Sequence, residues 1–137
     1  VFDGDRLLLQ KRADKYHSSG LWSNSCCSHP LPGESPPDAA SRRLFEEMGV
    51  RCDLEEAFQF TYRLDVPPDL IEHEYDHVFL GEWSGKPRPD TSEVADWRWA
   101  DIETLERELA TDASSFTPWF AIAYRQVRAR RDKLRSV

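Results

Sequence analysis

Residues 22–50 read WSNSCCSHPLPGESPPDAASRRLFEEMGV, and this stretch predicts a breaker-rich loop that leads into a short helix. Ser35 is a suitable cap, Pro36 and Pro37 fit the first turn, and Gly49 supplies the residue that ends the helix. Apolar residues recur within it at helical spacing, so one face is expected to pack on a core. The loop ahead of the helix carries a Cys-Ser-His trio, which places candidate reactive groups beside it.

Strand patterns lie on both sides of this loop and helix. Residues 6–12 (RLLLQKR) form an apolar run with a basic end, which suits a buried strand, and residues 21–29 are expected to be extended. Further strands are expected over residues 50–57, 58–64, 72–83 and 95–100, and helices over residues 101–109 and from residue 117 onwards. Because several strands are consecutive, the pattern favours an α/β sandwich with a mixed sheet over a doubly wound parallel sheet.

The composition indicates one folded domain over residues 1–137. The chain is long enough for a single core, and 39% hydrophobic residues argue against disorder. A formal net charge of −7 argues against a nucleic-acid partner, although a local basic pocket can still bind phosphates. Three cysteines make no disulfide framework, and no apolar run approaches the ~20 residues that span a bilayer. We therefore expect a cytoplasmic protein with reduced thiols and no membrane partner.

The candidate reactive groups are two carboxylates and a thiol–imidazole pair. Glu72 and Glu74 share one face of an extended strand, where burial without a cation or donors would cost free energy. A solvated face is an equally weighted alternative. Cys27 and His29 would also share a side, although a small buried hydrophobe is the commonest fate of a free cysteine, and we expect that fate for Cys26. One imidazole and two carboxylates would suit Mn²⁺, Mg²⁺ or Zn²⁺.

Three motifs, in order, resemble those of one enzyme family. Residues 22–30 (WSNSCCSHP) resemble the cysteine motif of type I isopentenyl-diphosphate isomerases, residues 72–74 (EHE) their second motif, and residues 117–119 (TPW) their C-terminal tryptophan motif. That family has the Nudix fold, an αβα sandwich with a mixed sheet, and the resemblance covers essentially the whole chain. Residues 42–50 are similar to the Nudix box of diphosphate hydrolases, but Arg42-Arg43 replaces its Arg-Glu pair.

The resemblance implies a role for each matching side chain. It assigns catalysis to Cys27, Glu74, Tyr62 and Trp119, phosphate contacts to Arg12, Lys15 and Arg43, a first metal site to His29, Glu72 and Glu74, and a Mg²⁺ site to Glu47 with the Cys27 carbonyl. Judged without the resemblance, Tyr62 and Trp119 would most often be core aromatics, and Glu46 and Glu47 a solvated helix face.

The family completes its first metal site with two upstream histidines, which nothing in this chain matches. The chain begins with Val, so we expect a preceding segment that carries them; a relative with a damaged metal site is the alternative.

The activity that the resemblance implies is reversible isomerisation of isopentenyl diphosphate to dimethylallyl diphosphate through a tertiary carbocation. The expected partner is therefore a small prenyl diphosphate, bound by a monomer or weak dimer. Two other classes remain open at this point. One is a Nudix hydrolase that cleaves a diphosphate, and the other is a diphosphate-binding relative without catalytic activity.

Overall fold

A computed structural model describes residues 1–13, 19–26, 29–66 and 70–135, with the backbone alone given for residues 62–66, 70–74 and 133–135. Its helices and strands, in chain order, are β1 (Phe2–Asp3), β2 (Arg6–Arg12), β3 (Trp22–Ser23), α1 (Pro36–Met48), β4 (Glu55–Val66), β5 (Leu70–Leu80), β6 (Val94–Asp101), α2 (Ile102–Thr111), a 3₁₀ turn η1 (Ala113–Ser115) and α3 (Pro118–Arg135).

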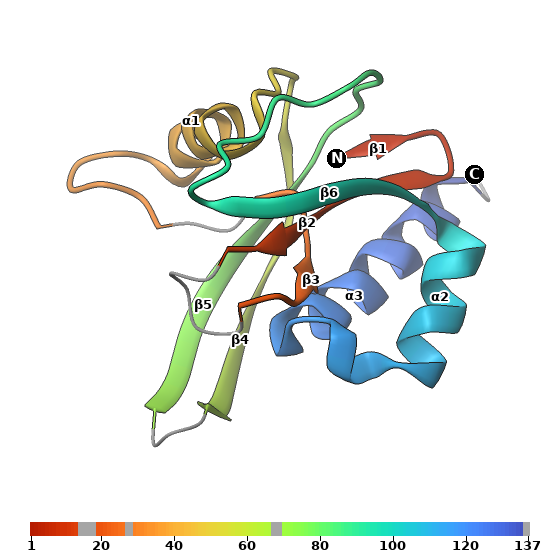
Figure 1. The fold of residues 1–137 in the computed structure, drawn as a ribbon. Helices are drawn as coiled ribbons and strands as arrows, with labels where there is room; N and C mark the ends of the chain where they lie inside the picture. Colours follow the sequence, from red (N-terminus) through yellow and green to blue (C-terminus); the bar gives the residue numbers. More distant parts are fainter. Residues whose placement is uncertain (14–18, 27–28, 67–69, 136–137) are drawn as a thin grey trace.

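The central strand is β2, which pairs antiparallel with β1, β3 and β6 in a four-stranded sheet. The long strands β4 and β5 form a separate antiparallel hairpin. Main-chain hydrogen bonds join the two sheets, because Phe2 N donates to Gly81 O at 2.8 Å and Trp83 N donates to Phe2 O at 2.9 Å. The β4–β5 hairpin is thereby fixed at one end and extends beyond the larger sheet (Figure 1).

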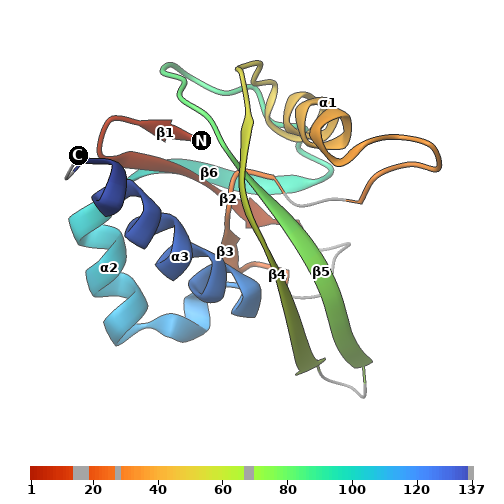
Figure 2. The same cartoon turned by 180° about the vertical axis from the view of Figure 1, so that it is seen from behind.

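Helices cover both faces of the four-stranded sheet. Helix α1 lies on one side, and α2 and α3 lie on the other, which Figures 1 and 2 show from opposite directions. The consecutive leucines of β2 explain this layering, since successive side chains of a strand point to opposite faces. Leu7 and Leu9 pack in the core beneath α2 and α3, whereas Leu8 packs with Leu44 and Met48 of α1. The predicted sandwich and buried strand are confirmed.

Helix α1 begins and ends where its sequence predicts. The Ser35 side chain accepts a hydrogen bond from Asp38 N, and Gly49 follows the helix with a φ of 67°. A side chain at Gly49 would also collide with Arg88, whose carbonyl oxygen lies 2.6 Å from the place of a Cβ atom. The segment after β5 therefore packs closely against the end of α1, where Asp90 N donates to Glu47 O at 2.9 Å.

Two strand predictions were wrong in extent. Within the described part of residues 21–29, only Trp22–Ser23 pairs as a strand, because farther back along β2 the main-chain N–H of Leu8 donates to Val1 O instead. The two strands expected over residues 50–57 and 58–64 form one strand, Glu55–Val66, with a register shift between Glu56 and Phe58. A bulge of this kind changes local pairing without ending a strand.

The sequence predicts no membrane-spanning segment, and the helices of the structure can be compared with that prediction. In the part of the chain that the structure describes, no helix combines the length and apolar character needed to cross a bilayer.

Candidate active site

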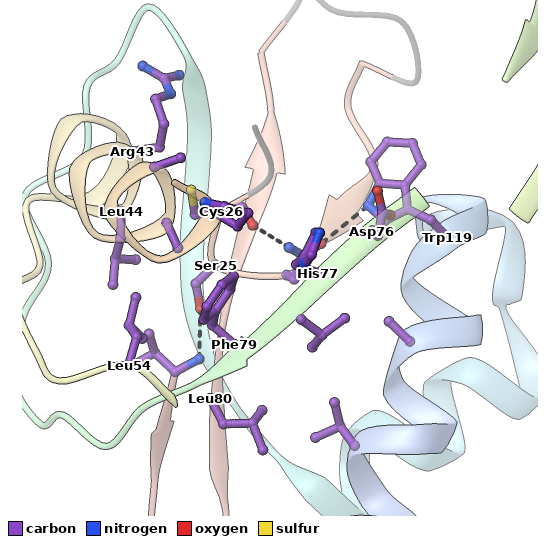
Figure 3. Close-up of a pocket in the computed structure, with 18 of the residues that line it drawn as sticks. Ser25, Cys26, Arg43, Leu44, Leu54, Asp76, His77, Phe79, Leu80 and Trp119 are labelled. Carbon is purple, nitrogen blue, oxygen red and sulfur yellow. Dashed lines mark hydrogen bonds between the residues drawn. The ribbon is translucent and has the colours of Figure 1, made fainter. Parts of the chain in front are cut away.

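A cavity of about 210 Å³ lies among the loop after β3, the β4–β5 hairpin, α1 and α3 (Figure 3). Its lining divides by chemistry into polar groups, Asn24, Ser25, Cys26, His29, Arg43, Asp76 and His77, and largely apolar ones, among them Leu44, Phe60, Val78, Leu80, Trp119 and Phe120. A cavity with an apolar wall and a few convergent polar groups is typical of a small-molecule site.

Arg43 and the buried carboxylate of Glu47 form the charged end of the site, in which Arg43 lines the cavity and Glu47 contacts the cavity-lining Cys26. Glu47 is 4% exposed, and its Oε2 accepts a hydrogen bond from Cys26 Sγ at 2.8 Å. Arg43 Nη2 lies 3.8 Å from Glu47 Oε1 and donates to Glu93 Oε1 at 2.9 Å. Burial raises the pKa of Glu47, while Cys26 and Arg43 partly offset that rise by favouring its charged form.

This geometry corrects two interpretations of the sequence, one for Glu47 and one for Cys26. A solvated helix face is wrong for Glu47, because α1 turns that side toward the sheet, while Glu46 is exposed. Cys26 is half-buried and makes a hydrogen bond, so it is more than a small core hydrophobe. Sequence spacing did not identify Glu93, which reaches Arg43 across fifty positions of the chain.

Trp119 and Arg12 lie together at another part of the site. The guanidinium carbon of Arg12 is 5.0 Å from the centroid of the Trp119 ring, and Arg12 is only 9% exposed. The indole Nε1 of Trp119 donates to Asn24 Oδ1 at 3.2 Å. A cation over an aromatic face at this distance is attractive. Arg12 therefore lies against the aromatic residue expected beside the hydrocarbon.

Five predicted side chains that the structure describes gather at one place. His29, Arg43 and Trp119 line the cavity, Glu47 contacts its Cys26 wall, and Arg12 contacts Trp119.

The remaining predicted groups are outside the described residues or side chains. Cys27 and Lys15 lie outside the described residues. The side chains of Tyr62, Glu72 and Glu74 are likewise not described, although the strand register pairs Tyr62 with Glu74 and Leu64 with Glu72. Their predicted roles stay predictions.

Some residues that line the cavity were not among the predicted site residues. Asp76 and His77, two consecutive residues of β5, both line the cavity. Figure 3 draws Asp76 beside Trp119 and Phe79 toward Ser25. Strand alternation separates the two faces of β5, but it does not show that consecutive residues of the strand can line one cavity.

The two consecutive arginines of α1 both contact Glu46, but their other partners differ. Arg43, which lines the cavity, donates to Glu93, whereas Arg42 donates from Nε and Nη2 to the two carboxylate oxygens of Glu34, at 2.8 and 2.9 Å. Leu31 N donates to the same carboxylate. Arg42 therefore fixes the loop between His29 and α1, while Arg43 is one of the residues that line the cavity.

The Glu34 ion pair predicts a defined acid dependence of stability. The hydrogen bond from Arg42 lowers the pKa of Glu34 from 4.5 to about 2. The pair therefore contributes its full stabilisation above pH 4.5, and this is lost as the pH falls toward 2. Thermal unfolding followed from pH 6 to pH 2 should show a shallower decline in Tm for Glu34→Gln than for the unmodified protein. Equal slopes would contradict this assignment.

Comparison with known proteins gives consistent results. The NUDIX domain family matches residues 1–120. The isopentenyl-diphosphate Delta-isomerase of Burkholderia multivorans is 53% identical over 88% of this chain and 69% of its own length. The isopentenyl-diphosphate Delta-isomerase 1 of Aromatoleum aromaticum is 48% identical over 99% of this chain and 78% of its own length.

Solved structures show the same fold at low sequence identity. The MutT NUDIX hydrolase of Burkholderia pseudomallei superposes with a TM-score of 0.72 at 21% identity, covering 93% of this chain and 92% of its own. The MutT protein of Methanosarcina mazei gives a TM-score of 0.71 at 20% identity, covering 93% of this chain and 86% of its own. At such identities the likeness concerns the fold alone.

Proposed function

Because this chain belongs to the Nudix family, and within it to the isopentenyl-diphosphate Delta-isomerases, we propose that it interconverts isopentenyl diphosphate and dimethylallyl diphosphate. The observation that carries the proposal is the identity of about half the positions with the isomerases over most of the chain. The site supports it, because Arg43 and Glu47 form its charged end, and Trp119 and Phe120 give the cavity an apolar wall.

The reaction needs an acid and a base on opposite sides of a short carbon chain. One carbon of the alkene gains a proton, and the tertiary carbocation then loses a proton from another carbon. We assign the thiol of Cys27 and the carboxylate of Glu74 to these transfers, with Tyr62 hydrogen-bonded to Glu74. Trp119 can stabilise the cation through its ring face, which is worth about 2 kcal/mol when water is excluded. The apolar lining supports that exclusion.

The diphosphate is assigned to the charged end. Arg43, Arg12 and Lys15 would provide its cationic contacts, since a guanidinium matches phosphate oxygens in pairs. Glu47 fits a Mg²⁺ site, because its oxygens are hard donors and a nearby cation would offset the burial of its charge. When bound, Mg²⁺ would neutralise diphosphate charge and so help hold the anion. Anchoring the anion would position the reacting carbons within the cavity.

The second metal site remains a proposal from sequence. His29 would share Mn²⁺, Mg²⁺ or Zn²⁺ with Glu72 and Glu74. Within the side chains that the structure describes, no three His, Cys, Asp or Glu groups are placed to hold a metal ion. His29 lines the cavity, which supports its place in the set. We also propose that the protein is cytoplasmic and that it is a monomer or weak dimer. Sedimentation of the purified protein would test the oligomeric state.

Product analysis separates this activity from its alternatives. Isopentenyl diphosphate incubated with the protein and Mg²⁺ should yield dimethylallyl diphosphate, seen by ¹H NMR as a new pair of allylic methyl signals. Phosphate release should stay at the level of the protein-free sample. A monophosphate product or released phosphate would instead identify a hydrolase. Calorimetric binding of the diphosphate without either product would identify a binding protein.

A further inference from the structure

The side-chain amide of Asn24 connects two parts of the site. Its Oδ1 accepts hydrogen bonds from Trp119 Nε1 at 3.2 Å and from Ser23 Oγ at 2.8 Å. Its Nδ2 donates to the main-chain carbonyl of Cys26. Figure 3 marks a hydrogen bond at Trp119 and another at Cys26, the two groups that this amide joins. Asn24 also lines the cavity.

Donor and acceptor chemistry allows only one orientation of this amide. An indole N–H can only donate, and a carbonyl can only accept, so Oδ1 must face Trp119 and Nδ2 must face Cys26. The single hydroxyl proton of Ser23 is given to Asn24. Thr117 Oγ1, 2.9 Å from Ser23 Oγ, is therefore the donor in that contact. Each group of the network has one role, and an ordered network of this kind is rigid.

The Ser23–Thr117 part of the network is buried, and main-chain contacts join the same two segments. Ser23 and Thr117 are each 1% exposed. Thr117 N donates to Trp22 O at 2.9 Å, and Trp22 forms a parallel bridge with Phe116. Strand β3 and the residues that lead into α3, almost a hundred positions apart, are thus held together by both main-chain and side-chain bonds. Asn24 is the member that reaches the indole edge directly.

We propose that Asn24 is a positioning residue that holds the indole of Trp119 and the carbonyl of Cys26 in a fixed relation. This inference rests on the proposed function, in which Trp119 faces the carbocation and Cys27, next to Cys26 in sequence, provides the thiol. The ring of Trp119 is restrained at its nitrogen by Asn24, and Arg12 lies over its face. The Asn24 amide therefore couples the Trp119 indole to the main-chain carbonyl that immediately precedes Cys27 in sequence.

Two substitutions of Asn24 distinguish its bond to Trp119 from its bond to Cys26, and a substitution of Thr117 controls for general disturbance of the buried network. Asn24→Ala removes both contacts. Asn24→Asp keeps acceptors for Trp119 and Ser23 but loses the donor to Cys26. Thr117→Val is the matched control, because it alters the same buried network without removing either direct contact of Asn24.

The first measurement does not depend on activity. The Trp119 indole N–H, assigned in ¹⁵N spectra by Trp119→Phe, should exchange with solvent about fivefold or more faster in Asn24→Ala, as expected for loss of one hydrogen bond. Asn24→Asp and Thr117→Val should exchange close to the unmodified rate. Unchanged exchange in Asn24→Ala would overturn the proposed restraint. This result stands even if the protein turns over no isopentenyl diphosphate, in which case the proposed function alone would fail.

The second measurement distinguishes positioning from a purely structural role. Asn24→Ala should lower kcat about 10- to 100-fold, as misplacement of catalytic groups does, while KM stays within about twofold because Arg43 is untouched. Asn24→Asp should lower kcat by less, and Thr117→Val should leave it within about threefold. A structural role would instead reduce Tm in Asn24→Ala and Thr117→Val alike, with normal kcat per folded molecule. That pattern would refute the inference.

Discussion

Cys27→Ala is expected to reduce isomerisation by at least about 10³-fold, because the thiol is the proposed acid that protonates, or base that deprotonates, an unactivated carbon. KM for isopentenyl diphosphate should change little, since the proposed diphosphate contacts come from Arg43, Arg12 and Lys15. Single-turnover conversion followed by ¹H NMR would measure the effect. Glu74→Gln should cause a comparable loss, because it removes the partner in proton transfer.

The adjacent cysteine is the matched control for this experiment. Cys26→Ser keeps a hydrogen-bond donor to Glu47 and alters the same loop by one atom. It should retain turnover within about tenfold of the unmodified protein, below the loss that removal of an acid–base group causes. Wild-type-like turnover in Cys27→Ala, or an equal loss in Cys26→Ser, would contradict the assignment of the acid–base role to Cys27.

Arg43→Met is expected to raise KM for the diphosphate about 100-fold and to destabilise the fold. A charge-assisted contact to the substrate is lost, and Glu93 and Glu47 lose the cation that lies between them. Loss of a hydrogen bond to a charged group should reduce the free energy of unfolding by about 2 kcal/mol. Steady-state kinetics and urea unfolding would measure the two effects separately.

Arg42→Met provides the comparison on the same helix. Arg42 contacts Glu34 and Glu46 rather than the groups at the cavity, so its loss should leave KM nearly unchanged. Similar KM increases in both variants would show that the helix charge acts nonspecifically. An unchanged KM in Arg43→Met would remove this arginine from the diphosphate site.

Local sequence was sufficient for the parts of the fold that depend on neighbouring residues. The alternating burial of Leu7, Leu8 and Leu9 follows from strand geometry, and the bounds of α1 follow from the chemistry of Ser35 and Gly49. Arg43 and Trp119, which the sequence motifs predicted to be site residues, do line one cavity. The same motifs were sufficient to identify the family.

By itself, then, the sequence determined the layers, the main helix and the identity of the motifs, since caps, turns and side-chain periodicity act over a few residues. Only the tertiary structure decided that Glu93 pairs with Arg43 and that Asn24 bonds Trp119. It also decided that Glu47 is buried against Cys26. These contacts join segments far apart in the chain, and their partners are chosen by how the sheet and helices pack, which no local pattern specifies.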